Sequence, residues 1–130
     1  MPDNTEKMPP EVMLSYDKGD LVIKEGDYGI SIYKILRGSV SITKKSDGAE
    51  IVLATLGPGD IFGEMVLWQL GKVSRTASVI AETKVKVGLL DNELLIKEYD
   101  SISPRLKSLF ESLIHRLSVT TQRAVKLATE

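Results

Sequence analysis

Residues 39–60 read SVSITKKSDGAEIVLATLGPGD and contain the pattern that decides the fold. Two runs, Ser39–Lys45 and Glu50–Leu56, flank an aspartate-glycine turn at 46–48. In the first run valine and isoleucine alternate with serine and threonine, and this period of two is typical of a half-buried strand. Because aspartate and glycine tolerate the left-handed backbone of a tight turn, the segment predicts an antiparallel hairpin.

Short runs of the same kind recur on both sides of this hairpin. Turns rich in glycine and aspartate separate them, for example at 18–20, 26–27 and 57–60. Many short strands at even spacing predict a closed or sandwiched antiparallel β-architecture. The further runs are Val12–Tyr16, Leu21–Glu25, Ile30–Leu36, Arg75–Glu82 and Lys84–Leu90.

The last forty residues have helical spacing instead. Asp91 can cap a short helix that extends through Tyr99, and Ser103 is a candidate N-cap before Pro104. From there a helix can run to about Ala128, roughly 37 Å at 1.5 Å per residue. So long a helix cannot bury its whole apolar stripe on a small β-domain, which predicts a second subunit against part of it. The stripe contains Leu106, Leu109, Phe110, Leu113, Leu117, Ala124 and Leu127/Ala128.

Composition limits the function. A chain of 130 residues with 42% hydrophobic residues suggests one domain, with a mobile polar tail at 1–10, a β-core at 11–90 and helices at 91–130. A net charge of -1 gives no basic footprint for nucleic acid or an anionic membrane. Cysteine is absent and no apolar run approaches the ~20 residues of a spanning helix. We therefore expect a soluble cytoplasmic protein that binds neither DNA nor membrane by itself.

One group of residues, Arg75 and the segment Gly63–Leu67, indicates a binding site. If Arg75–Glu82 is a strand, Arg75 lies on the inward face with Ala77, Val79 and Ala81. A buried arginine is unfavourable unless an anion or a carboxylate satisfies it. The segment Gly63–Leu67 can open a short helix whose free N–H groups seat a phosphate. Together they predict a site for a buried phosphate diester.

The order of these residues resembles the cyclic nucleotide-binding domain family over Met13–Ala128. That family includes kinase regulatory subunits, gated channels and bacterial catabolite activator proteins. The resemblance implies a mainly β fold, an antiparallel β-jelly-roll (double-stranded β-helix) with short flanking helices and a long C-terminal helix. The matching residues are Gly19, Gly26-Asp27, Gly38, Gly59-Asp60, Phe62-Gly63-Glu64 and Arg75-Thr76-Ala77.

Residues 116–128 are similar to the dimerisation helix of the catabolite activators. By that likeness the ligand is cAMP, with cGMP as runner-up, and the chain is a homodimeric sensor whose helix relays occupancy to an unknown downstream protein. Neither cofactor, metal nor catalytic residue is implied. The implied ligand-binding residues are Gly63, Glu64 and Met65 around the ribose and phosphate, Arg75 and Thr76 on the phosphate, Thr120 and Thr121 on the base, and Ile42 and Leu53 on the apolar wall.

Several alternatives stay open. Val66 stands where the family usually has a small residue, and the link Trp68–Ser74 is longer than usual. The chain could therefore be a ligand-free dimerisation scaffold. Since the sequence ends at Glu130, where the activators' DNA-binding domain would begin, it could also be the regulatory fragment of a larger transcription factor or channel.

For several of these residues a purely structural role is an alternative to a functional one. Glu64 and Arg75 could form a structural ion pair, and Thr120 and Thr121 could be polar positions in a helix seam. Trp68 is expected to be a packing anchor, and Lys44-Lys45 a solvated hairpin edge. His115 is the single histidine, which argues against a metal site and against a Ser-His-Asp enzyme.

Overall fold

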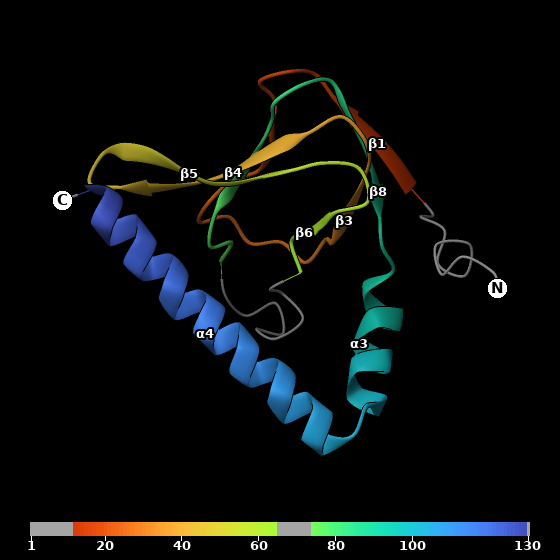
Figure 1. Cartoon of the computed structure of the whole chain (residues 1–130). Helices are drawn as coiled ribbons and strands as arrows, with labels where there is room; N and C mark the ends of the chain where they lie inside the picture. Colours follow the sequence, from red (N-terminus) through yellow and green to blue (C-terminus); the bar gives the residue numbers. More distant parts are fainter. Residues whose placement is uncertain (1–11, 65–73, 130) are drawn as a thin grey trace.

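The computed structural model of the chain describes residues 12–64 and 74–129. Two four-stranded sheets, with strand orders β1-β8-β3-β6 and β2-β7-β4-β5, form a jelly-roll (Figure 1), and every strand pairing is antiparallel. The expected fold class is confirmed. The strands are β1 (Val12–Tyr16), β2 (Leu21–Ile23), β3 (Tyr33–Arg37), β4 (Val40–Ser46), β5 (Ala49–Leu56), β6 (Ile61–Phe62), β7 (Ser78–Ala81) and β8 (Val85–Leu89).

Alternate residues of the strands form the core. In β8, Val85 and Val87 are buried while Lys86 between them is exposed, as a period of two requires. Phe62, from the two-residue strand β6, is also fully buried and stacks on Tyr33 with ring centroids 4.9 Å apart. A strand of two residues has no periodicity to detect, so β6 was not predicted.

The hairpin that decides the fold has the predicted turn. β4 and β5 pair antiparallel from Val40↔Leu56 to Ser46↔Ala49. At the turn, Asp47 and Gly48 have φ angles of 52° and 80°, in the left-handed region that aspartate and glycine tolerate. A register shift between Ile42 and Thr43 bends the pair.

Both predicted helix caps are present. Helix α3 (Asn92–Ser101) starts after Asp91, whose Oδ1 accepts a hydrogen bond from the Leu94 amide at 3.1 Å. Helix α4 (Pro104–Thr129) starts after Ser103, whose Oγ accepts from the Leu106 amide at 3.2 Å. These side-chain acceptors satisfy amides that have no partner within the helix.

Helix α4 runs back along the molecule, so that its C-terminal end lies beside the β4–β5 hairpin (Figure 1). Val125 is 6% exposed there. Along the rest of the helix the predicted apolar stripe stays exposed, from 39% at Phe110 to 61% at Leu117. Within the described residues, no helix is long and apolar enough to cross a membrane.

A matched pair of glycine substitutions tests the packing of the jelly-roll. Gly38 and Gly48 have similar φ angles, +82° and +80°. A Cβ at Gly38 would lie 2.2 Å from the Lys84 carbonyl oxygen, whereas one at Gly48 would have nothing within 4 Å. Both alanine variants bear the same left-handed strain, so the overlap should destabilise Gly38→Ala by about 2 kcal/mol more.

That difference corresponds to a melting temperature lower by on the order of 8 °C, measurable by circular dichroism. Equal melting temperatures for Gly38→Ala and Gly48→Ala would contradict the close approach of the Gly38 turn to Lys84.

Candidate functional site

The main chain of Arg75 is fixed against the turn after β2. Its amide donates to the Asp27 carbonyl at 2.7 Å, and its carbonyl accepts from the Gly26 amide at 2.9 Å. Arg75 lies just before β7, which begins at Ser78. The sequence predicted a strand that begins at Arg75, so this part of the prediction was wrong. The inward face was otherwise predicted correctly, since Val79 and Ala81 are buried.

The guanidinium of Arg75 is held by neutral backbone carbonyls. Nη1 donates to the Gly63 carbonyl at 3.1 Å and Nη2 to the Ser31 carbonyl at 2.7 Å. Among residues 12–64 and 74–129, no carboxylate lies within 4.0 Å of it, so the ion pair with Glu64 that competed as an interpretation is not formed. Within the described part of the chain, the arginine is bound by carbonyl dipoles and has no contacting counter-charge.

Burial lowers the pKa of Arg75, because a partly desolvated cation loses hydration that favours its charged form. Tyr33 and Glu64 act in the opposite direction, with smaller effects. A guanidinium also has five N–H donors, more than the two that the carbonyls use. The arrangement is therefore suited to accept an anion with forked oxygens.

Two glycines make room for this side chain. Gly63 has a φ of +84°, and a Cβ there would lie 2.7 Å from the Ser31 carbonyl oxygen and 3.2 Å from Arg75 Nη1. A Cβ at Gly29 would lie 3.4 Å from Arg75 Nε and Nη2. The glycine in the Phe62-Gly63-Glu64 stretch is thus required by space as well as by backbone conformation.

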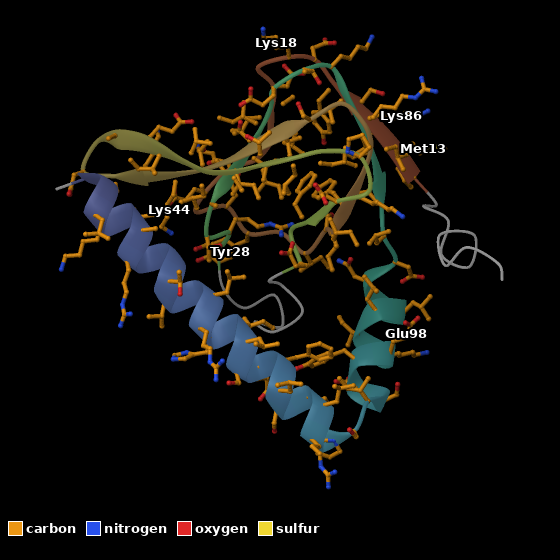
Figure 2. The ribbon with its side chains drawn as sticks, in the orientation of Figure 1. Met13, Lys18, Tyr28, Lys44, Lys86 and Glu98 are labelled. Carbon is orange, nitrogen blue, oxygen red and sulfur yellow. The ribbon has the colours of Figure 1, made fainter. Side chains whose placement is uncertain are left out.

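Lys44, on the hairpin edge that the sequence predicted to be solvated, contacts the main chain next to Arg75. Its Nζ donates to the Thr76 carbonyl at 2.8 Å and lies 3.8 Å from a carboxylate oxygen of Glu25. Glu25 also accepts from the Lys45 amide at 3.0 Å, and its own amide donates to Ser78 Oγ at 2.8 Å. Thr76 and Ser78, which follow Arg75 in the chain, are therefore held by β4 and by the end of the β2 segment, and no sequence spacing revealed these contacts. Figure 2 shows Lys44 from β4 beside α4.

The other predicted site residues are partly placed. Glu64, Ile42 and Leu53 are half-buried, and Ile42 packs against the core. Thr76 and Thr120 are exposed. Their roles stay predictions. Met65, Val66, Trp68, the short helix expected after Glu64 and the side chain of Thr121 lie outside the described residues.

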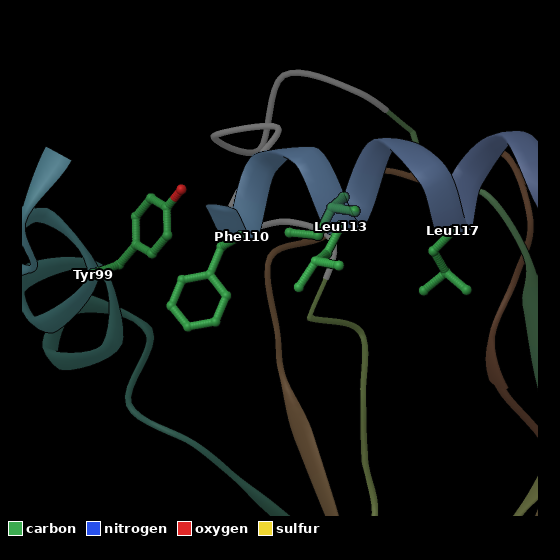
Figure 3. Close-up of a pocket in the computed structure, with 5 residues that line it drawn as sticks. Tyr99, Phe110, Leu113 and Leu117 are labelled. Atoms are coloured by element: carbon green, nitrogen blue, oxygen red, sulfur yellow. The ribbon is translucent and has the colours of Figure 1, made fainter. Parts of the chain in front are cut away.

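A hollow lies between the two helices, away from Arg75. It is an apolar cavity of about 340 Å³ (Figure 3), in which Tyr99 of α3 faces Phe110 of α4. Leu113, Ile114 and Leu117 also line it. None of these five residues belongs to the Arg75 site, and none of the five is charged. These five side chains suit an apolar occupant.

Comparison with known proteins agrees with this geometry. The family model described as "Cyclic nucleotide-binding domain" matches residues 13–101. The cAMP-dependent protein kinase type II regulatory subunit of Drosophila melanogaster is 41% identical over 81 residues, which are 62% of this chain and 21% of that protein. The cAMP-activated global transcriptional regulator CRP of Salmonella typhimurium is 32% identical over 117 residues, 87% of this chain and 54% of that protein.

A solved structure, the cAMP-bound form of EAL enzyme Bd1971, superposes with a TM-score of 0.75 at 30% identity, over 89% of this chain and 31% of that one. The cGMP-bound form gives a TM-score of 0.74 at 31% identity, over 82% and 28%. The chain thus spans from about a fifth to about half of the length of these relatives.

Proposed function

Because the chain belongs to the cyclic nucleotide-binding domain family, we propose that it is a regulatory sensor that binds cAMP reversibly and has no catalytic role of its own. The main support for this proposal is the environment of the Arg75 guanidinium. Its guanidinium is partly desolvated and bonded to two carbonyls, and no carboxylate in the described part of the chain lies within 4.0 Å. The phosphate of a cyclic nucleotide supplies the missing charge.

The remaining contacts follow from the family resemblance. Arg75 and Thr76 hold the cyclic phosphate, while Gly63, Glu64 and Met65 surround the phosphate and ribose, with Glu64 on the 2′-hydroxyl. Ile42 and Leu53 form the apolar wall, and Thr120 and Thr121 bond the base. The half-burial of Glu64 and its electrostatic interaction with Arg75 support its place at the ribose.

The preference for cAMP over cGMP is part of the proposal. Relatives whose names specify cAMP support it, as does the likeness of the α4 threonines to the adenine-reading pair of the activators. Thr76 argues the other way, because cGMP-selective relatives carry threonine after the arginine. A hydroxyl can accept from the exocyclic amine of adenine, and the α4 likeness extends over more residues.

Occupancy is relayed through α4 in this proposal. A ligand that contacts both the Arg75 seat and α4 binds one helix position better than others, and it shifts the helix population by that difference in affinity. Val125 is buried at the C-terminal end of α4, beside the β4–β5 hairpin, while Phe110, Leu113 and Leu117 stay exposed farther along the helix. The same helix joins two copies of the chain.

Isothermal titration calorimetry with cAMP and cGMP tests the binding. We expect cAMP to bind at micromolar affinity or better, about -8 kcal/mol, and more tightly than cGMP. At a hundredfold excess over the dissociation constant, linkage should stabilise the fold by about 2.7 kcal/mol and raise the melting temperature by on the order of 10 °C. No heat and no melting shift at millimolar cAMP and cGMP would leave a dimerisation scaffold as the function.

A further inference from the structure

Residues 30–32, here termed the strap, connect Arg75 to the start of α3. Three successive carbonyls of the strap accept hydrogen bonds from three different residues. The Ile30 carbonyl accepts from Asn92 Nδ2, the Ser31 carbonyl from Arg75 Nη2 at 2.7 Å, and the Ile32 carbonyl from the Leu90 amide at 2.9 Å. The strap thus lies between the guanidinium and the first residue of α3.

The directions of these three bonds alternate, as in a chain that continues β3 toward its N-terminal side. Successive carbonyls of an extended chain point to opposite edges. The Ile30 and Ile32 carbonyls both point to residues 90–92, in continuation of the pairing of Tyr33 with Leu89. The Ser31 carbonyl between them therefore points the other way, to Arg75. Fixing its two neighbours fixes the carbonyl that holds the guanidinium.

Asn92 is an unusual residue for a purely structural role at this position. Asp91 already caps α3, so Asn92 is not needed as the N-cap. Its Oδ1 is buried and has no hydrogen-bond partner among the described residues. A buried acceptor without a partner destabilises a fold, so Asn92 keeps its place through the bond that its Nδ2 donates to the strap.

We propose that Asn92 is a positioning residue for Arg75, which acts through the strap and couples the position of α3 to ligand affinity. Coupling is reciprocal. A ligand that orders Arg75 also holds the strap against Asn92 and draws in the start of α3. The effect on affinity rests on the proposed nucleotide binding, whereas the effect on the strap does not.

Asn92→Ala tests the positioning without ligand. The Leu90 amide, which donates to Ile32, reports on the strap directly. We expect its hydrogen exchange, measured by NMR, to be about fivefold faster in the variant, as the loss of one neutral hydrogen bond predicts. The melting temperature should change by less than about 3 °C, because alanine favours a helix and removes the unpaired acceptor.

Titration with cAMP forms the second arm. Asn92→Ala should bind cAMP and cGMP about fivefold more weakly, while the control Glu93→Ala, an exposed neighbour in the same turn, should bind as the wild type does. If the wild type binds no cyclic nucleotide, the proposed function fails and the Leu90 exchange alone decides the inference. Unchanged exchange, unchanged affinity in a binding wild type, or a melting temperature lowered by about 10 °C or more would overturn it.

Discussion

Replacement of Arg75 by alanine should weaken the binding of cAMP and cGMP together by about 100-fold or more. The cyclic phosphate is common to both nucleotides, so a contact to it cannot discriminate between them. Removing one partner of a buried charge pair costs about 2–5 kcal/mol, and each 1.4 kcal/mol is a factor of ten in affinity. Calorimetry on the variant measures this loss for both ligands.

Arg75→Ala should change the stability of the ligand-free protein far less than it changes the affinity for nucleotides. Arg75→Ala removes the bonds to the Gly63 and Ser31 carbonyls, but it also removes a partly desolvated cation. Because these effects oppose each other, we expect the melting temperature to fall by no more than about 5 °C. A large affinity loss with a small stability loss separates a ligand contact from a structural one.

Arg37→Ala is the matched control, since Arg37 is an exposed arginine at the end of β3. It should bind both nucleotides as the wild type does. Arg75→Lys keeps the charge but loses the forked donors, so its affinity should lie between those of the wild type and the alanine variant. Loss of cAMP binding alone, with cGMP binding retained, would show that Arg75 does not hold the shared phosphate.

Local features of this fold were predictable because local chemistry decides them. Asp91 and Ser103 cap their helices through a side chain and an amide three residues apart. The turn at Asp47 and Gly48 depends on the φ angles of those two residues. In each case the determining atoms lie within one turn of the chain, so the residue types are sufficient.

The site was less predictable, because backbone atoms from distant segments build much of it. Arg75 was identified from its apolar neighbours, but its partners are the carbonyls of Ser31 and Gly63. Every residue carries such a carbonyl, so sequence alone cannot show which ones are used. Lys44 was missed for the same reason, since its acceptor is the Thr76 carbonyl.

The sequence pattern of α4 predicts a second helix packed against it, which the structure of one copy of the chain does not include. Starting at Leu106, its apolar and small positions follow a spacing of four and three, which is the seam of a coiled coil. The described members of this seam are exposed, among them Leu113 at 49% and Leu127 at 71%. Among the described side chains of α4, the buried one is Val125, which is off the seam. The seam contains Leu106, Phe110, Leu113, Leu117, Thr120, Ala124 and Leu127.

Two α4 helices that packed along this seam would cover both apolar stripes. Phe110, Leu113 and Leu117 belong to the seam and also line the cavity of about 340 Å³, so a partner side chain could enter it as a knob enters a hole. Full burial of a leucine stabilises by about 1.5–3 kcal/mol relative to exposure. We therefore expect the wild-type chain to be a dimer at tens of micromolar.

Replacing Leu113 and Leu117 together by glutamate should convert this dimer to a monomer, because four carboxylates would meet in one apolar seam without counter-charges. Sedimentation velocity measures the change in mass. Leu21→Glu is the matched control: Leu21 lies in β2 and is 48% exposed, against 49% for Leu113. It gains one carboxylate per chain, against two in the double variant, at the exposure of Leu113, and should remain a dimer. A monomeric wild type, with and without cAMP, or a dimeric Leu113→Glu, Leu117→Glu variant would show that the stripe on α4 faces something other than a second copy of this chain.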